Sequence, residues 1–158
     1  MLDVIPQIEK TEVVRILEDI ATLLEFADTS VFEVMAFRNG AQYLDEWNGD
    51  LADAVANATL TEIYGIGKGL ASVISDLVLT GKSEKYDQLR TMFPETLLEL
   101  RRVPGLGTKK IKTLYEQLGI DSLDSLERAA KAQNIRKLKG FGAATEERII
   151  AAMERSRR

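Results

Sequence analysis

The chain has 158 residues, of which 45% are hydrophobic and 29% are charged, values that are ordinary for a globular protein. It contains neither cysteine nor histidine, which excludes disulfide bonds, thiol nucleophiles, imidazole metal sites and Ser-His catalysis. There is no apolar run of about 18 residues, and the first residues lack the layout of a signal peptide. The sequence therefore predicts a cytoplasmic protein without membrane partners.

Charge is distributed unevenly along the chain, although the net charge is only −4. Residues 1–60 carry three basic and twelve acidic side chains, whereas residues 101–158 carry fourteen basic and seven acidic ones. Such asymmetry indicates an interaction partner. Because the last third is basic, nucleic acid is a candidate for that partner despite the negative net charge. The alternative is that both surfaces are merely solvated.

Apolar positions recur at helical spacing, and no stretch alternates with a period of two, so the sequence predicts an all-α fold. Ser30 and Glu33 form a predicted capping box, and Asp121 is the predicted cap of a later helix. A domain boundary is expected near residues 82–94, where the charge balance changes. The expected helices cover residues 8–26, 31–47, 50–58, 69–79, 83–92, 95–101, 108–118, 122–132 and 143–155, with a short helical entry at 135–138.

Three short turns between these helices each hold an apolar residue between two glycines. We name them hairpin 1 (Gly65-Ile66-Gly67), hairpin 2 (Gly105-Leu106-Gly107) and hairpin 3 (Gly140-Phe141-Gly142). Each has another apolar residue two positions before its first glycine, which is the helix-hairpin-helix pattern. A single such turn is also used as a plain connector, but three in one chain favour a shared function.

The hairpins predict binding to a sugar-phosphate backbone. The helix that leaves each turn presents unpaired N–H groups and the positive end of its dipole, and the second glycine lets a phosphate approach them. No element is expected to contact base edges, so binding should be electrostatic and independent of sequence. The predicted DNA-binding residues are Gly65, Gly67, Lys68, Arg101, Arg102, Gly105, Gly107, Thr108, Lys109, Lys110, Lys139, Gly140 and Gly142. Further positive charge is expected from Lys112 at hairpin 2 and from Arg136, Lys137 and Arg148 at hairpin 3.

Several stretches resemble the N-terminal region of bacterial and archaeal family X (polymerase beta-like) DNA polymerases. They are FEVMAFRNGA at 32–41, GIGKGLAS at 65–72, LTGK at 79–82, VPGLGTKK at 103–110 and LKGFGAATEERI at 138–149. The resemblance covers residues 9–155 and implies a lyase-type helical domain at 1–88 and a duplex-binding domain at 89–158. It also implies that hairpin 1 grips the downstream strand at a DNA gap and that hairpin 2 grips the primer strand.

The resemblance further implies a monovalent cation, Na⁺ or K⁺, that bridges hairpin carbonyls to phosphate. No other cofactor is expected. The implied carbonyl ligands are those of Thr61, Ile63 and Ile66 at hairpin 1, and those of Arg101, Val103 and Leu106 at hairpin 2.

The chain departs from lyase-active members of the resembled family at the residues that carry the chemistry. The Schiff-base lysine of those members corresponds to Val73, and two further lysines and a tyrosine of their phosphate pocket correspond to Glu33, Gly69 and Phe37. Arg38 is retained. The polymerase carboxylates would lie beyond residue 158. The chain is therefore expected to bind DNA without catalysis.

Two alternatives stay open beside this interpretation. A lyase could use a relocated Lys68, Lys82 or Lys85, although all three are expected to be ordinary solvated lysines. Alternatively, acidic residues 1–60 could bind a protein, such as a C-terminal polymerase domain or another repair protein, with purely structural hairpins. The favoured hypothesis is a nucleoid-associated module that binds gapped or nicked duplex DNA, as part of a family X repair polymerase or of a non-catalytic relative.

Overall fold

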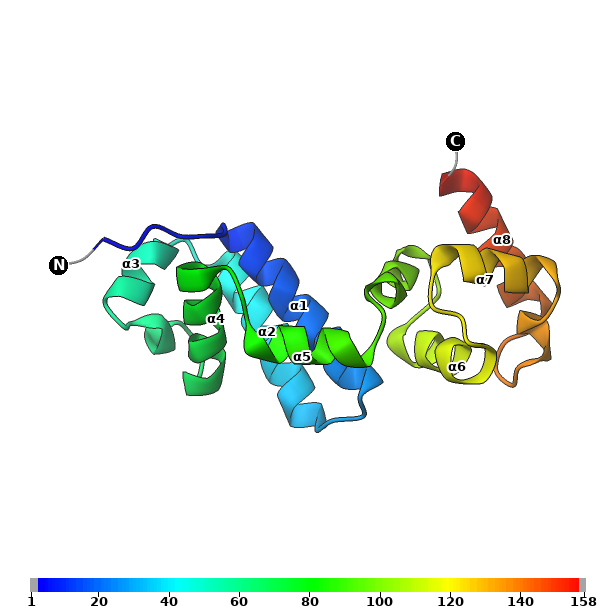
Figure 1. Cartoon of the computed structure of the whole chain (residues 1–158), viewed down its shortest axis with the longest axis horizontal. Coiled ribbons are helices and arrows are strands. Elements are labelled where there is room, and N and C mark those ends of the chain that lie inside the picture. The colour runs from blue at the N-terminus through cyan, green and yellow to red at the C-terminus, as the bar shows by residue number, and fades with distance from the viewer. Residues whose placement is uncertain (1–2, 157–158) are drawn as a thin grey trace. The chain divides into compact units, whose positions relative to one another are not determined.

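The computed structural model describes residues 3–156, and every regular element within that range is a helix (Figure 1). The all-α prediction is confirmed. Within the same range no helix is long and apolar enough to cross a membrane. The elements are α1 (Lys10–Phe26), α2 (Val31–Glu46), α3 (Leu51–Ala56), η1 (Leu60–Glu62), α4 (Lys68–Thr80), α5 (Glu84–Met92), η2 (Glu95–Arg102), α6 (Thr108–Leu118), α7 (Leu123–Lys131), η3 (Ile135–Lys137) and α8 (Ala143–Ser156), where η denotes a 3₁₀ helix.

The helices form two compact units, and the division falls between Met92 and Phe93. The predicted boundary between residues 88 and 89 lies inside α5. This helix packs on α1 and buries Tyr86 and Leu89, so all of it belongs to the first unit.

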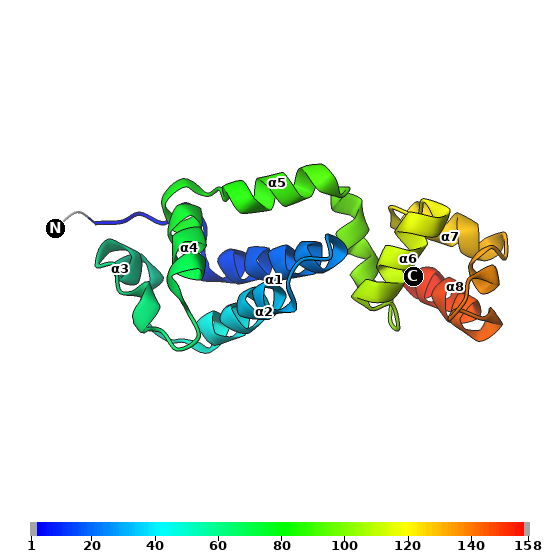
Figure 2. The ribbon, with the colours of Figure 1, turned by 90° about the horizontal axis from the view of Figure 1, so that it is seen from below.

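In the first unit α1 lies between α2 and α5, and α4 crosses their ends (Figure 2). The loop between α1 and α2 is only four residues long, which places the two helices side by side. The apolar faces of α1 and α2 that meet supply much of the core, and α4 adds to it. The largest side chains with almost no exposed surface are Leu17, Ile20, Leu23, Leu44, Ile74 and Leu77. Burial of this apolar surface is the main force that holds the first unit together.

The second unit has its own core, formed where η2, α6, α7, η3 and α8 meet. The entry helix of hairpin 2 and the exit helices of both hairpins in this unit contribute to it. Its fully buried side chains include Leu97, Leu100, Ile111, Leu114, Ile120, Leu126 and Ile135. Hairpins 2 and 3 therefore pack on the same hydrophobic core.

Two predicted helix caps differ from the structure. Ser30 caps α2 by accepting a hydrogen bond from the Phe32 N–H at 3.2 Å, but Glu33 does not complete a capping box and instead forms an ion pair with Lys85 on α5. The cap of α7 is Ser122, which exchanges hydrogen bonds with Ser125, and is not Asp121. In the first case a long-range charge partner outweighs the local cap.

A buried carboxylate joins α1 to α5. Asp19 is only 3% exposed and accepts hydrogen bonds from Arg15 Nη1 at 2.8 Å and from the Tyr86 hydroxyl at 3.2 Å. Arg15 also hydrogen-bonds Glu12 and so holds the pKa of Glu12 below its usual value. Burial, together with the neighbouring charge of Asp19, raises the pKa of Tyr86. The Tyr86 hydroxyl thus stays protonated and serves as a donor to a carboxylate that lies away from water.

We expect Tyr86→Phe to lower the free energy of unfolding of the first unit by about 1–2 kcal/mol, because it removes a donor to a buried charge. Thermal or urea unfolding followed by circular dichroism measures the change. Tyr64→Phe is the matched control, since Tyr64 is 78% exposed. An equal loss for both variants, or no loss for Tyr86→Phe, would contradict the role assigned to this hydroxyl.

Candidate nucleic-acid interface

Each hairpin is a tight turn with its first glycine in the third position. In hairpin 1 the Ile66 N–H donates to the Ile63 carbonyl at 3.0 Å, and the equivalent bonds of hairpins 2 and 3 are 3.2 Å and 3.1 Å long. The first glycines have φ values of +83°, +86° and +87°. A type II turn needs such a positive φ at its third residue, and glycine adopts it without strain. The first glycine is therefore required by the turn itself.

The second glycines of hairpins 1 and 2 are not required by the backbone. Gly67 and Gly107 have φ values of −87° and −81° with nearly extended ψ, which any residue adopts. A Cβ atom added at either position would meet no atom within 4 Å, so packing does not require glycine either. Both are the N-cap residues of the following helices, and neither helix has a side chain that caps its first N–H groups. The result is bare, open backbone at two helix N-termini.

Hairpin 3 differs at this point, because Gly142 has φ of +153°, a conformation that itself favours glycine. Gly142 is also only half-exposed, whereas Gly67 and Gly107 are exposed. Hairpins 1 and 2 thus share one backbone geometry, and hairpin 3 has a variant of it.

The middle apolar residue anchors each hairpin to its core. Ile66, Leu106 and Phe141 are 4%, 6% and 8% exposed. The residues before the first glycines lie on the outside, and Tyr64 is 78% exposed. Each turn therefore holds one side chain inward while its glycines remain at the surface.

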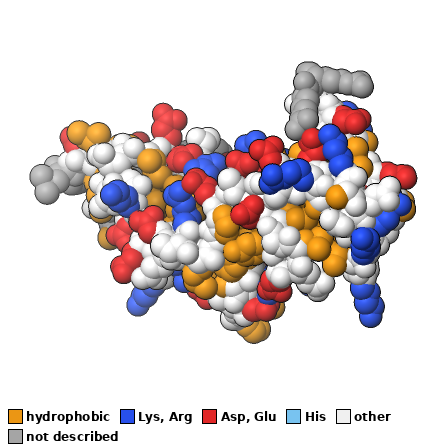
Figure 3. Space-filling view, turned by 45° about the vertical axis from the view of Figure 1, so that its right-hand side comes forward, with side chains coloured by type: hydrophobic (Ala, Val, Ile, Leu, Met, Phe, Trp, Pro, Cys, Tyr) orange, Lys and Arg blue, Asp and Glu red, His pale blue; other side chains and the backbone are white. Residues whose placement is uncertain are grey.

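Basic side chains without ion pairs gather at the hairpins. Within residues 3–156, the exposed side chains of Lys68, Arg102, Lys109 and Lys139 have no hydrogen-bond or ion-pair partner. Arg101 is also exposed, and Thr108 is half-exposed beside the second glycine of hairpin 2. Figure 3 shows lysine and arginine side chains that protrude from the second unit, in the right-hand part of the view.

Lys110 has a contact that the sequence did not indicate. Its Nζ lies 5.7 Å from the centroid of the Phe141 ring, so a residue of α6 touches the middle residue of hairpin 3. A cation over an aromatic face is attracted by the ring electrons. Lys110 thus links hairpins 2 and 3, whereas its neighbour Lys109 is exposed.

Arg136, which was expected to add positive charge at hairpin 3, forms an ion pair inside the second unit. Its backbone N–H and its Nε donate to the Glu146 carboxylate at 2.9 Å and 2.8 Å. Glu146 lies in the first turn of α8 and has no exposed surface. Burial alone would raise the pKa of Glu146, but the hydrogen bonds and charge of Arg136 outweigh it and hold the pKa below its usual value. A ten-residue separation carries no local signal, so the sequence alone could not reveal this pair.

The region that resembles a lyase pocket is neutralised by the chain's own carboxylates. Lys85 forms an ion pair with Glu33, and its Nζ lies 5.6 Å from the centroid of the Phe37 ring. Arg38 forms an ion pair with Glu25. The expectation that Lys85 is an ordinary solvated lysine is therefore wrong. A phosphate at this place would have to displace two internal anions.

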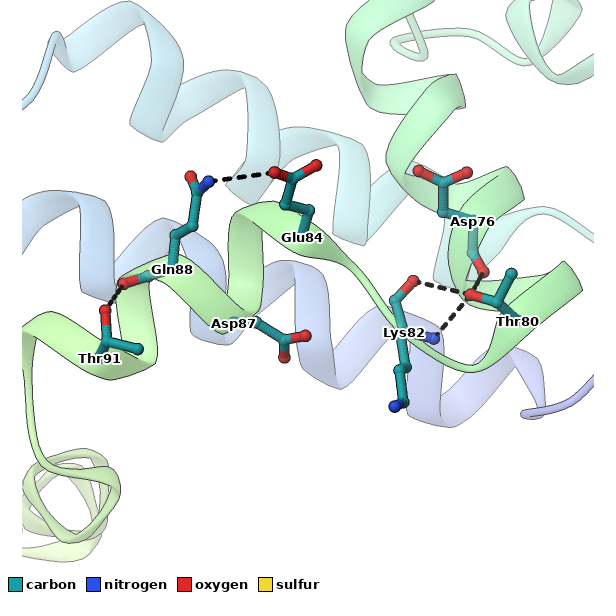
Figure 4. Close-up of a pocket in the computed structure, with 7 residues that line it drawn as sticks. All are labelled: Asp76, Thr80, Lys82, Glu84, Asp87, Gln88 and Thr91. Atoms are coloured by element: carbon teal, nitrogen blue, oxygen red, sulfur yellow. Dashed lines mark hydrogen bonds between the residues drawn. The ribbon is translucent and has the colours of Figure 1, made fainter.

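A second candidate lysine lies beside a hollow of about 510 Å³ between the end of α4 and α5 (Figure 4). Lys82 shares this hollow with three carboxylates, those of Asp76, Glu84 and Asp87. Carboxylates repel the sugar-phosphate of an abasic site, so the charge of the hollow does not suit such a substrate.

Comparison with known proteins identifies both units. Residues 8–83 match the model of a helix-hairpin-helix domain, and residues 97–155 match that of a SAM-like helix-hairpin-helix tandem. The chain is also 38% identical over 144 residues to the "DNA polymerase/3'-5' exonuclease PolX" of Bacillus subtilis (strain 168). Both units thus carry helix-hairpin-helix domains, and the chain is similar to part of a family X polymerase. The predicted resemblance is thereby confirmed.

The match covers 91% of this chain but 25% of the relative, so the chain spans about a quarter of that protein's length. The first matched region contains hairpin 1, and the second contains hairpins 2 and 3. The polymerase and exonuclease activities in the relative's name belong to that longer protein.

We expect Glu146→Gln to destabilise the second unit by about 1–3 kcal/mol, because it weakens two hydrogen bonds in a buried ion pair. The lowered pKa makes the contribution of the wild-type carboxylate full above its ordinary value of 4.5. The contribution is lost as the pH falls through the folded-state value, so the difference between variant and wild type should shrink in acid. Thermal unfolding between about pH 7 and about pH 3 measures it. Glu147→Gln, at the exposed neighbour, is the control and should change little.

Proposed function

We propose that the chain binds DNA without sequence preference, as the DNA-binding part of a family X repair polymerase or of a non-catalytic relative. This proposal depends on Gly67 and Gly107. Neither the backbone conformation nor the packing at these two positions requires a glycine. A glycine without a structural reason, at an uncapped helix N-terminus, suits the close approach of a phosphate. Such binding would place the protein with the nucleoid.

Hairpin 2 is proposed as the strongest contact. Phosphate oxygens would accept hydrogen bonds from the first N–H groups of α6, where the helix dipole adds attraction. Arg102 and Lys109 flank hairpin 2 in the sequence, and within residues 3–156 neither has an ion pair that phosphate would need to break. The second unit also carries fourteen basic and nine acidic side chains over residues 93–158, so its overall charge attracts DNA.

Hairpin 1 is proposed as a second contact of the same kind, with Lys68 as its cation. By the resemblance to family X polymerases, hairpin 1 would hold the downstream strand of a gapped or nicked duplex and hairpin 2 the primer strand. Hairpin 3 has the variant geometry at Gly142, and we assign it a weaker contact through Lys139.

A monovalent cation, Na⁺ or K⁺, is proposed at hairpins 1 and 2. Such ions take oxygen ligands. The first glycines of hairpins 1 and 2 have nearly the same φ, and the second glycines have nearly the same φ and ψ. This similarity supports assigning the same kind of ion to both hairpins. Among residues 3–156 no cluster of acidic side chains offers a competing metal site. The proposed carbonyl ligands are those of Thr61, Ile63 and Ile66, and those of Arg101, Val103 and Leu106.

A decisive test is Gly107→Ser, which should change stability and DNA binding in opposite directions. Serine at an N-cap accepts hydrogen bonds from the helix N–H groups and should stabilise α6 by a few tenths of a kcal/mol, about the usual gain over glycine. The same bonds occupy the groups that phosphate would use, so DNA affinity should fall about tenfold. Fluorescence anisotropy with a labelled gapped duplex measures affinity, and thermal unfolding measures stability.

Gly105→Ser is the matched control, because its φ of +86° strains any side chain, and it should lose about 1 kcal/mol or more of stability. Wild-type binding should weaken with salt, with log K falling against log salt at a slope of about −3 to −4. Full affinity of Gly107→Ser, or wild-type affinity that ignores salt, would contradict the proposal.

We further propose that the chain has no lyase activity. The supporting observations are Val73 at the position of the family's Schiff-base lysine and the ion pairs that neutralise Lys85 and Arg38. Borohydride trapping on incised abasic DNA should give no covalent adduct, because a Schiff base needs an available amine. Val73→Lys is the positive control, because it places a lysine at the family's Schiff-base position and should form the adduct. An adduct of the wild type that maps to Lys68, Lys82 or Lys85 would show the opposite.

A further inference from the structure

A second, smaller hollow lies beside hairpin 1. Its volume is about 210 Å³, and it is bounded by α4 and by the segment that leads into the hairpin. The α4 residues that line it recur at positions i, i+3, i+4 and i+7 and so form one face of the helix. The lining residues are Ala58, Leu60, Thr61, Lys68, Ala71, Ser72 and Ser75.

The hydroxyl groups of this hollow are not used by the protein. A hydroxyl on a helix commonly bonds the carbonyl four residues earlier, and Thr22, Thr80 and Thr113 do so at 3.2, 2.7 and 3.0 Å. In the described part of the chain, the hydroxyls of Thr61, Ser72 and Ser75 have no hydrogen-bond partner. Three hydroxyl donors therefore remain around one hollow.

The charge of this hollow is also unusual for the first unit. Over residues 1–92 the chain carries seven basic and sixteen acidic side chains, yet none of the described residues that line this hollow is acidic. Its one charged group is Lys68, whose ammonium has no ion pair within residues 3–156. The larger hollow in Figure 4 has the opposite character, because three carboxylates line it together with Lys82. One ammonium with several hydroxyl donors suits an oxyanion.

We propose that this hollow binds a phosphodiester group of the DNA strand that hairpin 1 holds. The inference rests on the proposed DNA binding and extends it along α4. Lys68 follows Gly67 directly, whereas Ser72 and Ser75 lie about one and two turns further along the helix. A strand held at the open backbone of Gly67 would thus find the next donors on this face. A single ammonium matches the single negative charge of a phosphodiester better than the larger charge of a terminal phosphate.

The double variant Ser72→Ala/Ser75→Ala tests the hollow without altering the glycines of hairpin 1. Alanine is the best helix former, so α4 should fold as before, and thermal unfolding checks this. Affinity for a labelled gapped duplex should fall about tenfold, because hydrogen bonds to a charged group are lost. The salt slope should stay constant, because no charge is removed. Lys68→Ala should reduce the slope by about one.

Thr80→Ala is the matched control, since it removes a hydroxyl from the same helix but from the carboxylate-lined hollow, and affinity should not change. Ser72→Lys adds a second cation and should raise affinity, a gain that misfolding cannot produce. In NMR titrations of the full chain, a thymidine dinucleotide should shift the Ser72 and Ser75 amides more than inorganic phosphate does. Stronger shifts with inorganic phosphate would overturn the assignment to a phosphodiester.

The two proposals fail in distinguishable ways. If Gly107→Ser weakens DNA binding while the serine variants leave it unchanged, the hollow binds no phosphate and the function of the hairpins stands. If neither change affects binding, both proposals are wrong. A loss for the serine variants that is matched by Thr80→Ala would likewise overturn the role of the hollow.

Discussion

The positive φ of the first hairpin glycine is the constraint on which each hairpin depends. At Gly65 and Gly105 it lets the chain reverse within four residues, so that the middle residue turns inward and the next helix begins at the surface. At Gly65 a side chain would also collide with the ring of Tyr43, 2.2 Å from the added Cβ atom. The first glycine thus sets the fold of the turn. In hairpins 1 and 2 the second glycine is not required by the turn, and it leaves the helix N-terminus open to a ligand.

Some cations are paired with carboxylates inside the protein, and others at the hairpins are not. In the first unit Arg15, Arg38 and Lys85 are each paired with carboxylates of the same unit, and one such pair replaces a predicted helix cap. The pairs of Arg38 and Lys85 are partly screened and add little stability, but all three pairs engage cations that could otherwise attract external anions. At hairpin 2, by contrast, Arg102 and Lys109 have no partner in the described chain. The distribution of pairing therefore separates structural charge from charge that is available to a ligand.

Local signals predicted the helices and the three turns, because hydrophobic spacing and glycine position act within a few residues. They failed where the decisive partner is distant in sequence. Glu33 fits a capping box by spacing, yet Lys85, 52 residues away, binds it. The prediction that Asp121 caps α7 was wrong for a local reason. The side chains of Ser122 and Ser125 each accept a hydrogen bond from the other residue's backbone N–H. The contact of Lys110 with Phe141 likewise depends on packing. No pattern marked the hollow beside hairpin 1, since serines on a helix normally indicate only solvent exposure.

Hairpin 3 shows how one turn can be adapted to a different task. Four residues after the second glycine, hairpin 2 buries Ile111, whereas hairpin 3 buries Glu146 at the same position. A buried carboxylate needs donors, and Arg136 supplies two from the position that Arg101 occupies in hairpin 2. This bond closes hairpin 3 from within, and Phe141 carries the contact on to Lys110 of α6. Hairpin 3 therefore uses Arg136 and Glu146 for an internal ion pair, and the contact of Phe141 with Lys110 packs it against the helix that follows hairpin 2.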